Sequence, residues 1–460
     1  MAGIGFELRR AVHEASYLNA IRGYLYAAVI SSGPWLLAIL TLSLLGVVSL
    51  GFMPQESRDL FAATTTHAFA ISLITVGLVQ MLVTRYLADR LYVNDLTAVA
   101  PTYVSVLVLS SLLQCMLMHL LLARTALPWD YRLPAVALYV AISGTWLSMI
   151  FLNAARDFVS IVLAFAIGFA VSFAGAIVLG PRFGPSGHLT GFAAGQVLTL
   201  ALLAMRVLVE FPADGSFTLA AFAYLRRFPS LLAIGVLYNL AFWADKIVFW
   251  FSHEGVDVGS YLRVFPLYDT SFFLASLTIV PALALFIVRI ETAFYEHYRA
   301  FYAAIANRRG WRDIAAAKEG MLKALPGTYL TLFKIQGAFA LLTIGLTPTI
   351  MGALRVPPSY WYIFRVAVLA ISVQVFLLVT VLLLLYLDLR GSVLIVSSLF
   401  LAANVVLTLL TLHLGFPYYG YGFLYASVIA LVVALVLLDN RMRNLEYLTF
   451  TRQPLIPEET

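Results

Sequence analysis

The sequence has a single cysteine and very little charge for its length. Only 11% of its 460 residues are Asp, Glu, Lys or Arg, and Cys115 is the one thiol. A disulfide framework is therefore excluded, and neither cysteines nor histidines have the spacing of a metal site. There is also no P-loop of the kind that binds ATP. We expect no cofactor, no metal and no enzymatic activity, and we interpret Cys115 as a packing residue.

Long hydrophilic segments are also missing, because 62% of the residues are hydrophobic and the mean hydropathy is +0.93. The chain consists instead of apolar stretches of about 20 residues, the length that a helix needs to cross a bilayer. Only helices and closed barrels satisfy their own backbone polar groups in lipid. The sequence therefore predicts an all-α integral membrane protein with twelve transmembrane helices and no separate soluble domain. The predicted spans are 24–50, 61–83, 102–122, 134–152, 159–179, 188–209, 229–251, 267–288, 327–351, 361–386, 391–414 and 418–438.

Basic residues are distributed unevenly between the predicted loops. With the N-terminus in the cytoplasm, and with Arg206 at the inner end of span 188–209 counted in the cytoplasmic link, 20 of the 29 Lys and Arg residues fall in cytoplasmic segments, six in outer loops and three within spans. Cytoplasmic loops of membrane proteins carry such an excess of Lys and Arg. We therefore expect both termini on the cytoplasmic side. The basic isoelectric point then reflects topology, and we expect no nucleic-acid partner.

Six spans on either side of a charged link indicate two halves. Because six is even, both halves insert with the same orientation, as a parallel repeat. Residues 1–23 lack the apolar run of a cleaved signal and predict an amphipathic helix on the membrane surface. The predicted domains are this segment 1–23, a first six-helix bundle with its link at 24–228, a second bundle at 229–438, and a cytoplasmic tail at 439–460.

The longest hydrophilic connection, Arg289–Leu325, predicts two amphipathic helices on the cytoplasmic face. Aromatic residues recur in it at helical spacing, and Gly310 separates the two helices. Such a hairpin is typical of anchoring to anionic lipid. Its aromatic density also fits a docking site for a cytosolic enzyme. The candidate docking residues are Phe294, Tyr298, Arg308, Arg309, Trp311 and Arg312.

Polar groups inside the predicted spans are candidates for a substrate pathway, because each is costly in lipid unless it faces protein or water. In span 1, Pro34 lacks a backbone donor, so Gly33-Pro34 predicts a kink that serves either packing or a hinge. Span 7 carries the densest polar cluster. Its Lys246 can be interpreted as extending to the membrane surface. Asp245 is not explained in this way, and it is poorly placed to pair with Lys246 because consecutive helical side chains project about 100° apart.

For each scattered polar group, packing between helices is the alternative to substrate contact. This holds equally for isolated residues such as Asn404 in span 11. Neutral polar groups interleaved with Trp and Tyr suit a sugar, whose hydroxyls take hydrogen bonds while aromatic faces cover the apolar side of the ring. The candidate pathway residues are Ser31, Ser32, Trp35, His67, Asn239, Trp243, Asp245, Lys246, Asp269, Lys334 and Gln336.

Three short motifs carry a resemblance to a known family. They are the opening MAGIGFELR, the run ISSGPW at 30–35 and the run WADKIVFWF at 243–251. These motifs resemble the PelG family of Pel exopolysaccharide exporters, within the multidrug/oligosaccharidyl-lipid/polysaccharide transporter superfamily. The resemblance extends over the whole length and the number of spans. It implies two six-helix bundles around a central cavity, through which an N-acetylhexosamine-rich polymer leaves the cell for biofilm formation.

The resemblance also implies a location and partners. The location is the inner membrane of a Gram-negative bacterium. The partners are a PelF-like cytosolic glycosyltransferase that uses a nucleotide-sugar, and PelD-like and PelE-like companion membrane proteins, one of them a cyclic-di-GMP receptor. Three alternatives remain open. A flippase for lipid-linked oligosaccharide would need cationic cavity residues for a pyrophosphate. An ion-coupled small-molecule antiporter would need Asp245 or His67 to titrate. A scaffold would assemble a synthase without transport.

Overall fold

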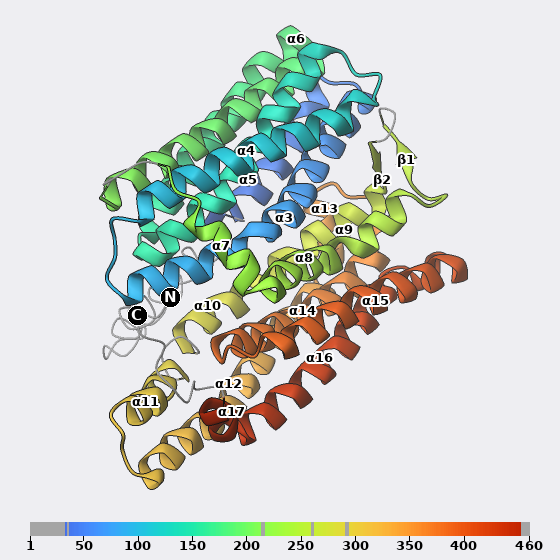
Figure 1. Cartoon of the computed structure of the whole chain (residues 1–460). Helices are drawn as coiled ribbons and strands as arrows, with labels where there is room; N and C mark the ends of the chain where they lie inside the picture. Colours follow the sequence, from blue (N-terminus) through green and yellow to red (C-terminus); the bar gives the residue numbers. More distant parts are fainter. Residues whose placement is uncertain (1–32, 35, 213–216, 259–261, 290–293, 452–460) are drawn as a thin grey trace, which may run out of the picture.

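The computed structural model describes residues 33–34, 36–212, 217–258, 262–289 and 294–451, most of them in helices (Figure 1). Ten of the helices in these ranges are long and apolar enough to cross a membrane, and Leu36–Gly51 forms a shorter apolar helix. The prediction of an all-α integral membrane protein is therefore confirmed. The predicted surface helix at 1–23 lies outside the described residues.

After the helix Leu36–Gly51, the described part of the first half contains four long helices and one short one. Apolar side chains dominate each long helix, as a membrane-spanning segment requires. The elements are η1 (Ser49–Gly51), α3 (Gln55–Tyr92), α4 (Val99–Ala123), α5 (Trp129–Ala155), α6 (Phe158–Glu210) and α7 (Ala220–Arg227).

Helix α6 is a hairpin of two spans. Its 53 residues would extend about 80 Å as one straight helix, far more than a bilayer is thick. The chain turns at Gly184, whose φ of 62° and ψ of −146° suit a residue without a Cβ. Beyond the turn the chain runs back along itself, since Ser172 Oγ donates to the Phe192 carbonyl at 2.8 Å. Helix α6 thus contains the predicted spans 159–179 and 188–209, so the ten helices make eleven crossings.

The second half begins at α8 and includes a small antiparallel hairpin in which Val256 pairs with Val264. Helices α9 and α10 together form one span, joined by a 3-10 turn. The elements are α8 (Pro229–Trp250), β1 (Val256–Asp257), β2 (Arg263–Val264), α9 (Pro266–Ser276), η2 (Leu277–Ile279), α10 (Val280–Arg289), α11 (Tyr295–Ala306), α12 (Trp311–Gly345), α13 (Thr347–Ala353), η4 (Pro358–Tyr360), α14 (Trp361–Tyr386), α15 (Arg390–Leu414), η5 (Phe416–Tyr418), α16 (Tyr421–Arg443) and α17 (Leu445–Thr451).

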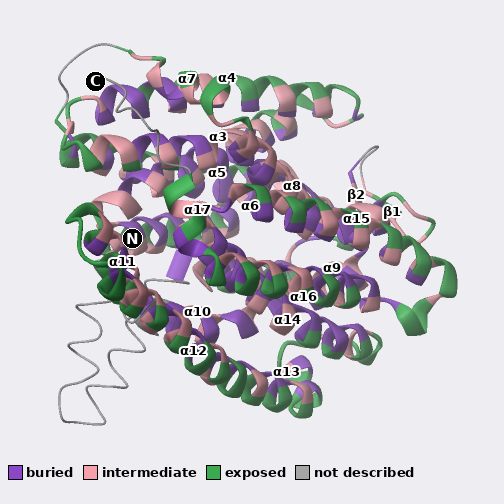
Figure 2. Ribbon diagram, turned by 60° about the horizontal axis from the view of Figure 1, so that its bottom comes forward, coloured by how far each residue is buried: buried purple, intermediate pink, exposed green. Residues whose placement is uncertain are grey.

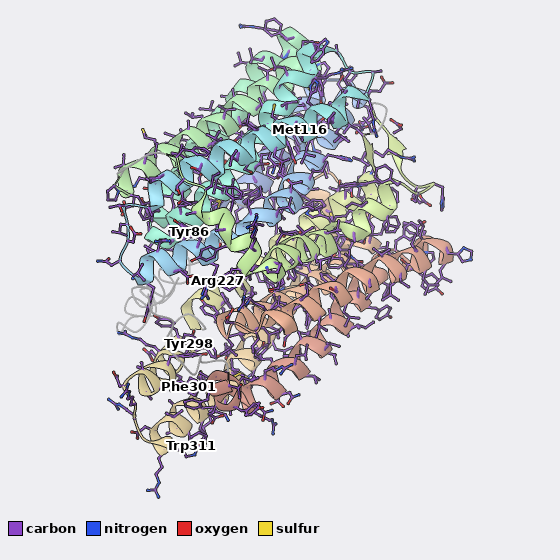
Figure 3. The ribbon with its side chains drawn as sticks, viewed as in Figure 1. Tyr86, Met116, Arg227, Tyr298, Phe301 and Trp311 are labelled. Atoms are coloured by element: carbon purple, nitrogen blue, oxygen red, sulfur yellow. The ribbon has the colours of Figure 1, made fainter. Side chains whose placement is uncertain are left out.

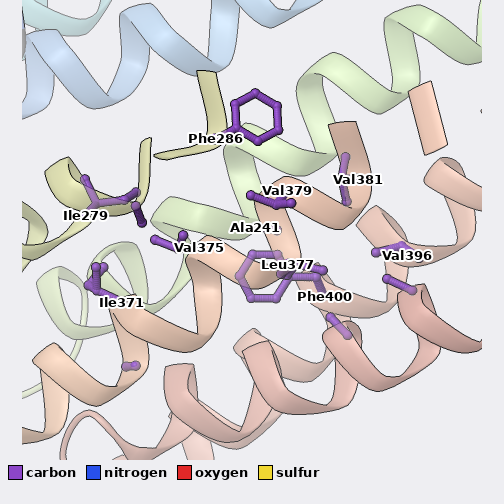
Figure 4. Packing of buried hydrophobic residues seen from close by; sticks show 14 of the residues in the cluster. Ala241, Ile279, Phe286, Ile371, Val375, Leu377, Val379, Val381, Val396 and Phe400 are labelled. Atoms are coloured by element: carbon purple, nitrogen blue, oxygen red, sulfur yellow. The ribbon is translucent and has the colours of Figure 1, made fainter. Parts of the chain in front are cut away.

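Each half has its own hydrophobic core. Buried side chains of the first half, such as Tyr139 and Phe151, form one cluster. Those of the second half form another, in which Val375, Leu377 and Phe400 pack together (Figure 4). Separate cores are what two helix bundles require, because each bundle must bury its own apolar faces. The exact division at residue 228 stays a prediction.

The two halves meet where α3 lies against α8. Gly77 and Gly235 face each other there, and a Cβ atom on Gly77 would lie 2.5 Å from the Gly235 carbonyl oxygen. Small residues let two membrane helices approach this closely. Asn239 Nδ2 crosses the contact and donates to the Leu73 carbonyl at 3.0 Å. The predicted polar group Asn239 therefore joins the two halves.

The helix ends gather at two faces of the molecule. We call one the basic face; it carries the connections 93–98, 156–157 and 387–389 together with α7, α11 and α17. The opposite face carries the connection 124–128, the α6 turn, the β hairpin and α13. Figure 1 shows α11 and α17 at the lower left and the β hairpin at the upper right, at the two ends of the bundle.

The amphipathic hairpin does not end at Leu325, where the sequence predicted its end. Helix α12 runs without a break from Trp311 to Gly345, so the second hairpin helix and span 9 are one helix instead of two segments meeting at Leu325. Strong helix formers such as Ala, Leu and Lys fill this region and keep the helix continuous. Pro326 lies within it.

The aromatic residues of the hairpin are used largely for internal packing. Phe294 and Phe301 are 3% and 0% exposed, within the core of the second half. The Tyr298 ring lies 4.7 Å from that of Tyr302. Trp311, in contrast, is 62% exposed at the start of α12 (Figure 3). The aromatic density of the hairpin is therefore no argument for docking, because most of it stabilises the protein's own fold.

Candidate substrate cavity between the two halves

A cavity of about 940 Å³ lies between the two halves. The first half lines it with side chains of Leu36–Gly51, α3, α5 and α6, and the second half with side chains of α8, α9, α10 and α14. The lining extends from Arg58 and Tyr360, near the opposite face, to Asn153 and Leu382, near the basic face. Its size is that of a small-molecule site, and the interface between halves is where transporters bind their substrates.

The cavity wall is mainly apolar, with indole rings and neutral polar groups set into it. Trp146 comes from the first half and Trp243 from the second. Trp146 is oriented by the bond from its Nε1 to Ser72 Oγ, at 3.3 Å. The neutral polar residues in the wall are Ser43, Ser49, Gln55, Thr65, Thr66, Thr145, Asn153, Gln196, Thr270 and Ser276.

Asp245 and Lys246 form an ion pair, contrary to the prediction. Lys246 Nζ lies 3.0 Å from Asp245 Oδ2, and the two residues are only 6% and 0% exposed. The lysine stem is long enough to fold back to its neighbour, which overcomes the angle between the two side chains. Lys246 therefore does not extend to the membrane surface, and the interpretation as an interfacial lysine is corrected.

The Asp245 carboxylate is held by groups from three helices. Tyr268 of α9 donates its hydroxyl to Asp245 Oδ2 at 2.7 Å. Asn404 of α15 lies 3.5 Å from Oδ1 and donates to the Ala241 carbonyl at 2.8 Å. Thr408 in turn donates to Asn404 Oδ1 at 3.1 Å. A buried charge needs this number of partners, because they offset the free energy that is lost when the charge leaves water.

The Lys246 ammonium group is surrounded by aromatic rings. Its Nζ lies 4.6 Å from the ring centre of Phe272, 4.9 Å from that of Phe423 and 5.1 Å from that of Phe242. Ring faces attract a cation within about 6 Å. Lys246 lines the cavity whereas Asp245 does not. The lysine is thus part of the wall, and its charge is compensated from behind by the carboxylate.

A second carboxylate, Asp269, lies in the cavity wall nearer to the opposite face. It accepts a hydrogen bond from Trp250 Nε1 at 2.9 Å and another from the Phe265 backbone N–H at 3.0 Å. The Trp250 ring also stacks on His67 of α3, with 4.4 Å between ring centres. Trp250 therefore links Asp269 in the second half to His67 in the first.

The structure brings part of the predicted pathway together. Trp243, Lys246 and Asp269 line the cavity, as does Pro34 of the predicted hinge. Asp245 lies directly behind this wall. The neighbouring Gly33 is helical and buried, and the hinge itself stays a prediction. Three further candidates, Ser31, Ser32 and Trp35, lie outside the described residues.

Neither Lys334 nor Gln336 lies in the wall of this cavity. Two positions apart on a helix, they point in nearly opposite directions. Lys334 is exposed on the outer surface of α12. Gln336 is buried in the second half, where its Nε2 donates to Ser372 Oγ at 3.0 Å.

Sequence reasoning missed most of the groups that hold the ion pair. Asn404 was visible as a polar residue in an apolar span, but its contact with Asp245 joins positions 159 residues apart. Phe272 and Phe423 look like ordinary apolar residues of a span. The lining residue Gln196 was also missed, although a glutamine within an apolar span was a signal that could have found it.

Comparison with known proteins places this chain in a family. A family model named "PelG: Putative exopolysaccharide Exporter (EPS-E)" matches residues 1–450. No curated protein matches the sequence.

Solved structures show the same fold. The crystal structure of a MATE mutant has a TM-score of 0.63 at 16% identity, over 92% of this chain and 96% of that chain. A MOP superfamily transporter from Pyrococcus furiosus, whose title describes a binding pocket of reversed polarity, has a TM-score of 0.60 at 17% identity, over 91% and 96%. An outward-facing multidrug resistance MATE family transporter has a TM-score of 0.61 at 16% identity, over 92% and 96%. With the family match over residues 1–450 and this fold, the chain belongs to the PelG family and is a multi-pass membrane transporter.

Proposed function

We propose that this protein exports a nascent N-acetylhexosamine-rich exopolysaccharide, Pel, across a bacterial inner membrane to the periplasm, where the polymer serves biofilm formation. The observation that carries the proposal is the cavity between the halves, with its indole rings and neutral polar groups. Membership of an exporter family and the transporter fold support it.

The chemistry of the wall suits a sugar chain. The apolar face of a sugar ring can lie on an indole such as that of Trp243 or Trp146, while hydroxyl and amide groups such as those of Thr145 and Gln196 take its hydrogen bonds. Among the described residues, the wall offers no free cation at depth, since Lys246 is paired with Asp245. A pyrophosphate-linked lipid carrier would need such a cation, which favours a polymer over a lipid-linked substrate.

The orientation follows from the distribution of charge. We place the basic face in the cytoplasm, because Lys and Arg are enriched in cytoplasmic connections. A PelF-like glycosyltransferase would then meet this face. There Arg309, Trp311 and Arg312 are exposed at the turn between α11 and α12. PelD-like and PelE-like membrane proteins complete the assembly in this proposal.

Inverted membrane vesicles test the proposal, because their cytoplasmic face points outward. Vesicles that contain the glycosyltransferase and its membrane partners, with or without this chain, are supplied with a labelled UDP-N-acetylhexosamine. The polymer is then exposed to a glycosidase outside the vesicle. We expect a protected fraction only when this chain is present.

Other results would point to other functions. A loss of total polymer without any change in the protected fraction would indicate a scaffold. Label that extracts into organic solvent as a lipid-linked product would indicate a flippase. Polymer that stays fully accessible in the presence of the chain would contradict the proposal.

A further inference from the structure

Lys334 is a charged residue on the outer surface of a membrane-spanning helix. Helix α12 lies along one edge of the second half, with many exposed residues (Figure 2). Lys334 is exposed between Phe333 and Ile335, which are 64% and 38% exposed. Within the described part of the chain, no side chain or carbonyl group pairs with its ammonium group.

Two hydrogen bonds between α12 and α14 fix the depth of Lys334. Gln336 Nε2 donates to Ser372 Oγ at 3.0 Å, and the Tyr329 hydroxyl lies 2.8 Å from Thr380 Oγ1. Lys334 lies between Tyr329 and Gln336, and is therefore level with the midpoint of α14. Each end of α14 is about 18 Å away at 1.5 Å per residue. A lysine side chain that extends to the membrane surface does so from near a helix end, so this ammonium group cannot reach the lipid headgroups.

A charge at this depth requires a partner of opposite sign, because intramembrane ionisable groups pair with one another or face water. A second copy of this chain does not offer one in its described part. The carboxylates at membrane depth there are Asp245, which is buried, and Asp269, which faces the central cavity. The other described acidic residues lie near the two faces.

We propose that the surface of α12 around Lys334 docks a transmembrane helix of a different protein, which carries an Asp or Glu at the same depth. The positive charge of Lys334 requires a negative charge on this partner helix. The surface also permits close approach, since no other atom lies within 4 Å of where a Cβ on Gly327 or Gly337 would be. Interhelical polar pairs and small residues together stabilise helix association in membranes. The inference does not depend on which substrate the transporter carries.

Site-specific photocrosslinking in the native membrane tests this proposal. A photoreactive amino acid replaces Ala338, one turn from Lys334 on the same surface, in the full-length chain. The matched control carries it at Val406, which is 63% exposed on α15. We expect the Ala338 probe to capture a membrane protein whose span contains an Asp or Glu, and the Val406 probe not to capture it.

Substitutions of Lys334 then test the role of its charge. Lys334→Leu should lower the crosslink yield about ten-fold, while Lys334→Arg should retain most of it. Lys334→Asp combined with a lysine in place of the partner's acid should restore the yield. Thermal stability of the purified Lys334→Leu protein should equal that of the wild type, because the side chain has no partner within the described chain.

Three results would overturn the proposal. The first is adducts with lipid or with a second copy only. The second is capture of a protein without an intramembrane acid. The third is a yield that Lys334→Leu leaves unchanged.

Discussion

Asp245 and Lys246 are consecutive residues of α8 whose side chains form a buried ion pair of 3.0 Å. The lysine stem folds back along the helix, and its Nζ also donates to the Phe242 carbonyl at 3.3 Å. The carboxylate is bonded to α9 and lies against α15. The pair therefore joins three helices of the second half, and it presents a lysine of compensated charge to the cavity.

The first prediction concerns Asp245→Asn. This substitution removes the negative charge and leaves Lys246 among aromatic rings without a counter-ion. Breaking a buried pair in this way costs about 3–5 kcal/mol. We expect a large fall in thermal stability in detergent, which can be measured from the loss of the monodisperse peak in size-exclusion chromatography after heating.

Two comparison variants make this test specific. Asp245→Asn combined with Lys246→Met removes both charges and should regain most of the lost stability, because a buried pair often contributes little over apolar groups. Asp439→Asn breaks the exposed pair with Arg443 and should cost about 0.5 kcal/mol or less. If the double variant is as unstable as the single one, the uncompensated lysine is not the cause.

The second prediction concerns the indole of Trp243 in the cavity wall. Trp243→Ala removes a ring face on which a sugar can lie, and aromatic contacts of this kind are worth about 0.5–1.5 kcal/mol. We expect the protected polymer in inverted vesicles to decrease about two- to ten-fold, with total polymer unchanged. Trp129→Ala, at an exposed indole outside the cavity wall, is the control and should leave export unchanged. An equal loss in both variants would argue against a substrate contact at Trp243.

The third prediction concerns the contact between the halves. Gly77→Ala would place a Cβ atom 2.5 Å from the Gly235 carbonyl oxygen, so α3 and α8 must move apart. Overpacking of this kind costs about 1–3 kcal/mol, and transport should fall with the stability of the protein. Gly391→Ala, where no atom lies within 4 Å of the new Cβ, should change stability by no more than about 1 kcal/mol. A fully stable and active Gly77→Ala protein would show that the two halves are not held at this point.

The fold was largely accessible from the sequence, because the length and apolarity of a span are local properties. The bounds predicted for span 10, 361–386, coincide with those of α14, and span 7 differs from α8 by one residue. The hairpin within α6 was also visible, since two apolar runs flank a segment with glycine and proline. The continuity of α12 was not, because polar residues near Leu325 hid a helix that continues from the surface into the membrane.

The site was predicted less well, because it depends on contacts between distant segments. Polarity identified Asp245 and Lys246, but only the fold shows that Tyr268 and Asn404 hold the carboxylate. The same criterion grouped Lys334 with the cavity residues, since sequence alone does not show which side of α12 faces the interior. An intramembrane charge thus indicates a function without showing whether it faces a cavity or a partner.

The last prediction concerns Asp157, which closes the base of the α6 hairpin at the basic face. Its Oδ1 accepts the Ser160 backbone N–H at 3.2 Å and caps α6, and its Oδ2 accepts a hydrogen bond from Arg206 near the other end of the hairpin. Partial burial alone would raise the pKa of Asp157. The bonds from Arg206 and Ser160 outweigh this effect and hold the pKa below its ordinary value.

Because the folded-state pKa of Asp157 lies below the unfolded value, its charge stabilises the fold at neutral pH, and this contribution is lost as the pH falls through the folded-state pKa. Asp157→Asn keeps a capping oxygen but loses the charge, so it should be less stable than the wild type at pH 7 and approach it as the pH falls below about 4. Asp157→Ala loses the capping oxygen as well as the charge, so it should stay about 1 kcal/mol less stable than Asp157→Asn across the pH range. Thermal unfolding of the three proteins in detergent across this pH range measures the effect. A deficit of the Asn variant that is independent of pH would mean that packing, and not the charge, holds the base of the hairpin together.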